Sequence, residues 1–159
     1  MKRNVPDYVG ITKLGLIPLR NFAIIDPIKN IYRSGQPMYS YEYAWLKNKL
    51  GINTIVNLRS ELNHDDTMNV QGFKVINVNI PDHCTPTLEQ AKDFIKLIKN
   101  EDNILFHCEH GRGRTSVFCV LTRLAMGWTL KRALEEESSV FGYDFQHPKQ
   151  LEFLKTNFK

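Results

Sequence analysis

The stretch that decides the fold is FHCEHGRGRTSVFCV, residues Phe106 to Val120. It continues the apolar run NILF, which predicts a buried strand, and it leads into TSVFCVLTRLAM, residues 115–126, which predicts a helix that is apolar on nearly every side. Between the two, Cys108 is followed by a five-residue loop that contains two glycines and ends before Arg114. A strand, a short loop and a buried helix in this order form the unit from which parallel sheets are built.

Strand and helix patterns alternate on both sides of this unit. Two short strands are predicted within residues 22–33, and further strands at 53–59, 74–80 and 103–108. Helices are predicted at 39–51 with Ser40 as N-cap, at 87–99, at 115–126, and at about 129–139 and 147–157. The predicted fold is α/β: a single compact domain over residues 1–159, with a central, mostly parallel sheet of about four to five strands flanked by helices on both faces. Ligands of such sheets bind beyond the carboxyl ends of the strands, where Cys108 lies.

Charge and hydropathy narrow the possible partners. The chain of 159 residues has a formal net charge of +4 and a pI near 9.0, which suits an anionic substrate but is less than nucleic-acid-binding domains usually carry. We therefore predict no nucleic-acid partner. No apolar run approaches the roughly 20 residues of a membrane span. Polar residues interrupt segment 1–21 before a signal-length apolar run develops, so a cytoplasmic protein is expected, or a secreted or periplasmic one if a signal peptide has been removed.

The three cysteines are Cys84, Cys108 and Cys119, an odd number without the paired short spacings of a zinc site. Free thiols are therefore expected, and neither a metal nor a cofactor is predicted. Cys119 is interpreted as an inert residue of the buried helix. Cys84 is interpreted in the same way, with a protective disulfide to Cys108 as the less favoured alternative.

The loop after Cys108 has the composition of an anion-binding site. Its backbone N–H groups can all point inward, because glycines allow the positive φ angles that such curvature needs. The N-terminus of the next helix adds further N–H groups and the positive end of a dipole. The same field favours a thiolate, so Cys108 is the predicted nucleophile, and Arg114 can clamp two phosphate oxygens with its planar fork. The residues between them are Glu109, His110, Gly111, Arg112 and Gly113.

The pattern H-C-x5-R-[ST], formed by His107, Cys108, Arg114 and Thr115, resembles the active-site loop of the cysteine-dependent protein tyrosine phosphatase superfamily. The resemblance implies a metal-independent phosphomonoesterase with a cysteinyl-phosphate intermediate. It implies that Thr115 helps to expel the thiolate from that intermediate, and that His107 orients the loop by hydrogen bonding. Two alternatives remain: a phosphate-binding pseudophosphatase, and a rhodanese-like sulfur transferase, whose loop lacks the Arg-Thr helix start paired with an upstream acid.

Cleavage of a phosphoester of an alcohol also needs a general acid, which protonates the leaving oxygen. Asp82 in IPDHCTPT is the best candidate, because it follows the strand at 74–80 on a loop bracketed by prolines. Superfamily members carry their acid on a comparable upstream loop. Asp65 and Asp66 are rivals, although their surroundings, NHDD, are more typical of a solvated loop.

Three longer sequence segments reduce the number of candidate substrates. IPDHCTPT, HCEHGRGRT and NLRSE, within roughly residues 53–126, resemble the protein-tyrosine-phosphatase-like phytases. This resemblance implies an inositol polyphosphate substrate such as phytate, myo-inositol hexakisphosphate, with His83 as a second contact to the scissile ester and Glu109 as a buttress of the loop. The cations expected around the pocket mouth are Arg59, His83, His110 and Arg112. The protein-tyrosine-phosphatase-like phytases are usually much larger than this chain, so several of their pocket-lining segments must be missing or shortened here.

The segment IYRSGQP, residues 31–37, resembles the compact, atypical dual-specificity phosphatases of fungi, plants and bacteria, some of which also act on inositol phosphates. A small catalytic core with a shallow site is then expected. A phosphoprotein is the alternative substrate, as for a protein tyrosine or dual-specificity phosphatase. None of the six tyrosines can be identified from the sequence as one that sandwiches a phenyl ring.

Overall fold

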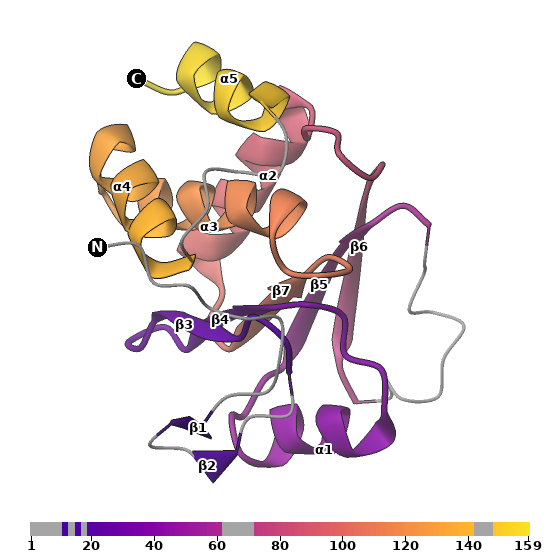
Figure 1. Ribbon diagram of the computed structural model, residues 1–159. Helices are drawn as coiled ribbons and strands as arrows, with labels where there is room; N and C mark the ends of the chain where they lie inside the picture. Colours follow the sequence, from indigo (N-terminus) through magenta and orange to yellow (C-terminus); the bar gives the residue numbers. More distant parts are fainter. Residues whose placement is uncertain (1–10, 13–14, 17–18, 62–71, 142–147) are drawn as a thin grey trace.

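The computed structural model describes residues 11–12, 15–16, 19–61, 72–141 and 148–159. Its main sheet has five strands in the order β3-β4-β7-β5-β6 (Figure 1). β4, β7, β5 and β6 are parallel, and β3 pairs with β4 in the antiparallel direction. The strands are β3 (Ala23–Asp26), β4 (Ile31–Ser34), β5 (Thr54–Arg59), β6 (Lys74–Ile80) and β7 (Ile104–His107), and a separate antiparallel pair is formed by β1 (Ile11–Thr12) and β2 (Gly15–Leu16).

Helices cover both faces of this sheet (Figure 1). On one face lies α1 (Ser40–Asn48), and on the other side lie α2 (Leu88–Asn100), α3 (Gly113–Ala125), α4 (Leu130–Phe141) and α5 (Pro148–Asn157). Side chains alternate along each strand, so Leu105 belongs to the core under α1 while Phe106 belongs to the core under α2 and α3. The predicted α/β fold is confirmed. Among the described residues, no helix is both long and apolar enough to cross a membrane.

The first turns of α1 and α2 are fixed differently. The prediction that Ser40 caps α1 is wrong: Ser40 is already helical, and the N-cap Tyr39 makes no side-chain capping bond. The Glu42 carboxylate instead accepts the Met38 N–H at 2.7 Å. At α2 a capping box forms. The Thr87 hydroxyl accepts the backbone N–H of Gln90, and the side-chain oxygen of Gln90 accepts the backbone N–H of Thr87. This box fixes the end of the segment that contains Asp82.

The parallel strands all end at one edge of the sheet. Ser34 and Asn57 lie beside His107 in the register, and Arg59 lies beside Ile80. The segments that follow these strands therefore meet at the same edge. They are residues 35–37 after β4, 60–61 after β5, 81–87 after β6 and 108–112 after β7.

Candidate active site

The cysteine loop, residues 108–113, turns its carbonyl groups outward. Cys108 is only 3% exposed and follows β7 directly. A trans peptide directs its N–H away from its C=O, and the described residues contain no cis peptide bond, so the N–H groups of His110, Gly111 and Arg112 point into the loop. This is the arrangement of an anion-binding nest. The outward carbonyls are bound as follows: that of Glu109 by the Arg20 side chain (3.1 Å) and the Gln36 N–H (2.9 Å), that of His110 by the Asn21 amide (2.7 Å), and that of Gly111 by the Arg33 guanidinium.

Two glycines let the cysteine loop lie directly on the segment after β4. Gly111 has a φ of +76°, and a Cβ at this position would lie 2.6 Å from the backbone nitrogen of Gly35. A Cβ on Gly35 would lie 3.0 Å from the carbonyl oxygen of Glu109. A larger residue at either position therefore requires the backbone to move. This close contact ties the conformation of the cysteine loop to the IYRSGQP segment.

The sulfur of Cys108 accepts a hydrogen bond from Thr115. The two atoms, Thr115 Oγ1 and Cys108 Sγ, are 2.9 Å apart, and both side chains are buried. Helix α3 begins at Gly113, so its first turn directs a positive dipole end at the same place. A donor hydroxyl and a helix N-terminus both stabilise a negatively charged sulfur more than a neutral one. The geometry therefore suits a nucleophilic thiolate.

Arg114 is held in a fixed orientation by Glu61, a residue to which the sequence predictions assigned no role. Arg114 Nη1 and Nη2 donate to the two carboxylate oxygens of Glu61, both at 2.9 Å, and Nη1 also donates to the Ile80 carbonyl at 2.8 Å. Burial, the largest single influence, lowers the pKa of Arg114, but the hydrogen bonds to Glu61 and the negative charges of Cys108, Glu61 and Asp82 together outweigh it, so the pKa is raised. The sequence did hold a signal for Glu61: it lies two residues beyond a buried strand, at the edge where ligands bind.

Replacing Glu61 by glutamine is expected to reduce the acid sensitivity of the fold. In the wild type, hydrogen bonds from Arg114 lower the pKa of Glu61 from 4.5 to about 2. The ion pair therefore stabilises the fold fully above about pH 4.5 and is lost as the pH falls toward 2. Thermal unfolding midpoints, measured between about pH 6 and pH 2, should fall less steeply in Glu61→Gln than in the wild type. Glu101→Gln, which removes a surface pair with Lys74, is the control. Equal slopes for Glu61→Gln and the wild type contradict the prediction.

Asp82 lies beside the guanidinium of Arg114. Its Oδ1 is 3.5 Å from Arg114 Nη2 and accepts the backbone N–H of His83 at 3.0 Å. The imidazole of His83 lies next to the other oxygen, with Nε2 3.6 Å from Oδ2. Both side chains are more than half exposed, so a leaving group could reach them from solvent. The rival aspartates, Asp65 and Asp66, lie outside the described residues.

The mouth of the site mixes cations and anions. The Arg59 guanidinium is bound to Glu61 through Nε at 2.9 Å, and its Nη2 lies 3.9 Å from the Glu109 carboxylate. His110 is exposed and lies beside Glu109, with Nε2 3.9 Å from Oε1. Arg112 is half-buried and is the N-cap of α3. The structure thus places Arg59 and His110 beside a shared partner, Glu109, and the carboxylates of Glu61 and Glu109 accompany these two cations at the mouth.

The remaining predicted residues lie behind the site or at its rim. His107 is buried, and its Nδ1 lies 3.3 Å from the carbonyl oxygen of Cys108. All three cysteines are free thiols: Cys84 is exposed, and Cys119 is buried in α3, where burial raises the pKa of its thiol. No group of three His, Cys, Asp or Glu side chains that could hold a metal ion occurs in the described part of the chain.

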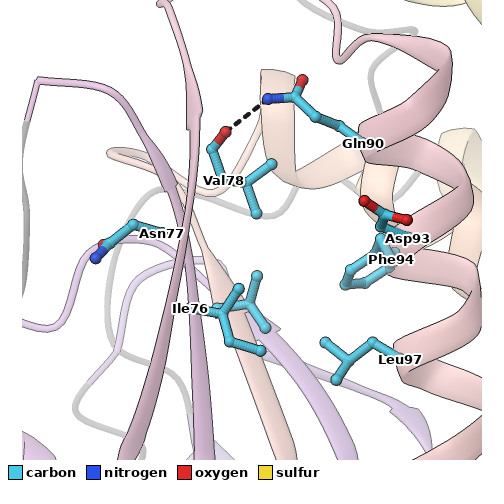
Figure 2. Close-up of a pocket in the computed structure, with 8 residues that line it drawn as sticks. Ile76, Asn77, Val78, Gln90, Asp93, Phe94 and Leu97 are labelled. Atoms are coloured by element: carbon cyan, nitrogen blue, oxygen red, sulfur yellow. Dashed lines mark hydrogen bonds between the residues drawn. The ribbon is translucent and has the colours of Figure 1, made fainter.

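A pocket of about 400 Å³ lies between β6 and α2 and is separate from the cysteine loop (Figure 2). Ile76 and Val78 of β6 face Phe94 and Leu97 of α2 across it. At one end the Gln90 amide donates to the Val78 carbonyl at 2.7 Å. No residue of the cysteine loop lines this pocket, so it is not part of the candidate active site.

Known proteins resemble this chain in both sequence and structure. It is 28% identical over 123 residues to the dual specificity protein phosphatase TpbA of Pseudomonas aeruginosa, an alignment that covers 70% of this chain and 55% of TpbA. The chain thus spans about half the length of the curated relatives it matches. Its fold is similar to the core catalytic domain of the PP-IP phosphatase SIW14 from S. cerevisiae, with a TM-score of 0.73 and 23% identity, covering 89% of this chain and 87% of that one. It is also similar to Tk-PTP in the active form, with a TM-score of 0.66 and 21% identity, covering 86% and 95%.

A family model matches residues 30–125, more than half of the chain. The matched region runs from β4 through the Asp82 segment and the cysteine loop to the end of α3. Its description is "Tc-R-P: Polymorphic toxin system, DSP-PTPase phosphatase". Because this model covers more than half of the chain, including the Asp82 segment and the cysteine loop, the protein belongs to the DSP-PTPase phosphatases of polymorphic toxin systems, within the cysteine-dependent protein tyrosine phosphatase superfamily.

Proposed function

We propose that the protein hydrolyses phosphomonoesters through a cysteinyl-phosphate intermediate. The observation that carries this proposal is the 2.9 Å hydrogen bond from Thr115 to the sulfur of Cys108, the first residue of the cysteine loop. In the first step the Cys108 thiolate attacks phosphorus, and the bond from phosphorus to the ester oxygen breaks. Asp82 donates its proton to that oxygen, so the alcohol leaves uncharged.

In the second step water attacks the phosphorus of the phosphocysteine. The ionised Asp82 accepts a proton from this water, the P–S bond breaks, and its electron pair returns to sulfur. The Thr115 hydroxyl stabilises the departing thiolate by the same hydrogen bond. Arg114 and the loop N–H groups hold the other phosphate oxygens in both steps, so the mechanism requires no metal.

Replacing Asp82 by asparagine is expected to slow poor leaving groups more than good ones. A sugar or alkyl ester needs the proton that Asp82 supplies, whereas p-nitrophenolate leaves readily without it. We expect kcat to fall about 100-fold on an alcohol ester and less than about tenfold on p-nitrophenyl phosphate. Asp102→Asn, which changes an exposed aspartate paired with Lys29, is the control. Equal losses on both esters remove Asp82 from the role of general acid.

The favoured substrate is an inositol polyphosphate. The resemblance of the Asp82 segment and the cysteine loop to phytases supports it, and so does the fold shared with SIW14, which is described as a PP-IP phosphatase. Cationic side chains at the mouth, such as Arg59, whose side chain is 15% exposed, suit phosphates beyond the one being cleaved. Glu61 and Glu109 limit this excess of positive charge, so a substrate with fewer phosphates is favoured over a fully phosphorylated ring.

A phosphotyrosine protein is the second candidate, and one observation favours it. Tyr39 and Tyr41 stack with ring centroids 5.6 Å apart, and both are more than half exposed. They follow Gln36, whose N–H binds the Glu109 carbonyl of the cysteine loop. Exposed aromatic rings suit the phenyl ring of a substrate, and these two lie three and five residues after Gln36 in the chain. TpbA, described as a dual specificity protein phosphatase, agrees with this candidate.

One assay separates the two candidates. Phosphate release is measured from inositol hexakisphosphate, from a less phosphorylated inositol and from a phosphotyrosine peptide, with a chelator in every reaction. Faster release from either inositol phosphate supports the favoured substrate, and faster release from the peptide selects the second. Activity that appears only after a divalent ion is restored contradicts the metal-free mechanism.

A further inference from the structure

A buried ionic cluster lies behind the cysteine loop. It consists of Arg33 on β4, Arg123 on α3 and Glu137 on α4, with side chains 0%, 5% and 1% exposed. Glu137 Oε1 accepts from Arg33 Nη1, and Glu137 Oε2 accepts from Arg123 Nη1 at 2.9 Å. A buried ion pair is weak evidence for stability, because desolvation of its charges offsets their attraction. Stability alone therefore does not account for the cluster, so the other groups that its arginines bind are relevant.

Of the two arginines, Arg33 is the one that binds the loop. Its Nη2 donates to the Gly111 carbonyl, while Nη1 of the same guanidinium is bound to Glu137. The Gly111 carbonyl belongs to the same peptide group as the Arg112 N–H, and in a trans peptide these two point in opposite directions. Arg33 thus binds the outer end of the peptide group whose inner end faces the anion-binding nest.

We propose that Arg33 and Glu137 are positioning residues for the phosphate site: Glu137 fixes the guanidinium of Arg33, and Arg33 holds the Gly111 carbonyl outward so that the Arg112 N–H faces the phosphate. This inference rests on the proposed function, because it takes the cysteine loop as the phosphate site. A cationic donor also polarises the peptide group that it binds, and this makes the N–H at the other end a stronger hydrogen-bond donor. Arg33 therefore favours anion binding without touching the anion.

The contact also opposes rotation of this peptide group. Gly111 has a φ of +76°, and a glycine has no Cβ that would restrict its backbone to one conformation. Rotation would bring the carbonyl oxygen of Gly111 inward, where it repels a phosphate oxygen. The bond from Arg33 holds that oxygen outside the nest. Glu137 carries the constraint to α4, which packs on α3.

The test compares Arg33→Met with Arg123→Met. Both changes remove a buried guanidinium from the same carboxylate, but the first also removes the bond to the Gly111 carbonyl. Two quantities are measured in each variant of the 159-residue chain: the Kd for tungstate, a tetrahedral oxyanion, and the pH profile of Cys108 alkylation by iodoacetamide. The groups that lie around Cys108 (His107, Arg114, Asp82 and Glu61) are the same in both variants.

We expect Arg33→Met to weaken tungstate binding about tenfold more than Arg123→Met does. We also expect its alkylation profile to move to higher pH, since a misdirected N–H no longer stabilises the thiolate. Both variants should lower the thermal unfolding midpoint, which is the effect that a merely structural role produces. If Arg33→Met does not fold, Arg33→Lys replaces it, because a single ammonium group cannot bind Glu137 and Gly111 as a planar fork does.

Equal tungstate affinities and superimposable alkylation profiles in the Arg33 and Arg123 variants overturn the inference. Failure of the proposed function is a different result: the wild type itself then neither binds tungstate nor releases phosphate from any ester. A wild type that binds and hydrolyses, with an Arg33 variant no weaker than its Arg123 counterpart, rejects the positioning role alone.

Discussion

Replacing Cys108 by serine is expected to abolish phosphate release while leaving the affinity for tungstate within about threefold of the wild type. A serine hydroxyl stays protonated at neutral pH, so no phosphoenzyme forms, and loss of a nucleophile costs roughly 10⁴-fold or more in kcat. The N–H groups of the cysteine loop and the Arg114 guanidinium, which we propose as the anion-binding groups, are unchanged by this substitution. The two measurements are kcat on p-nitrophenyl phosphate and the Kd for tungstate.

Cys84→Ser is the matched control. It makes the same sulfur-to-oxygen change at an exposed thiol two residues from Asp82, and it should leave kcat unchanged. A second check is mass spectrometry of the enzyme quenched during turnover, which should show a phosphate adduct on the wild type and none on Cys108→Ser. Turnover that survives in Cys108→Ser identifies the activity as that of another nucleophile or of a contaminant.

The sequence predicted the fold because the relevant patterns are local. Apolar strands alternate with amphipathic helices, and that alternation alone indicates a parallel sheet with two covered faces. The strand, the cysteine loop and the buried helix also follow one another directly, so the proximity of Cys108, Arg114 and Thr115 follows from their order in the chain. Asp82 was placed near them by a different rule, because the carboxyl ends of parallel strands share one edge.

The partners that orient these residues could not be predicted, because they are distant in sequence. Glu61 lies 53 residues before Arg114, and Glu137 lies 104 residues after Arg33. A carboxylate near the end of a strand has no local mark that distinguishes a surface residue from one that binds a buried arginine. For the same reason Arg59 could be predicted from the sequence as a cation of the mouth, but the carboxylates of Glu61 and Glu109 beside it could not. Charges can be counted in a sequence, but their pairing is a property of the fold.

Replacing Arg114 by lysine is expected to lower kcat/KM on the order of 10³-fold, although the positive charge is kept. The guanidinium uses its Nη1 and Nη2 end for Glu61 and a further N–H of Nη1 for the Ile80 carbonyl. The edge formed by Nε and Nη2 carries the N–H groups that can grip two phosphate oxygens at once. Lysine offers three donors on a single point and cannot be held by Glu61 while it clamps a phosphate.

Two further variants identify which property of Arg114 matters. Glu61→Gln keeps the guanidinium but weakens its anchor, so a smaller loss in kcat/KM, about tenfold, is expected. Arg132→Lys makes the same chemical change on the exposed surface of α4, where the guanidinium lies over the Trp128 ring, and should leave kcat/KM unchanged. Activity of Arg114→Lys within about tenfold of the wild type would mean that charge alone suffices at this position. That result would reject the bidentate clamp. It would also remove the proposed reason for Glu61 to bind the Nη1 and Nη2 end of the guanidinium.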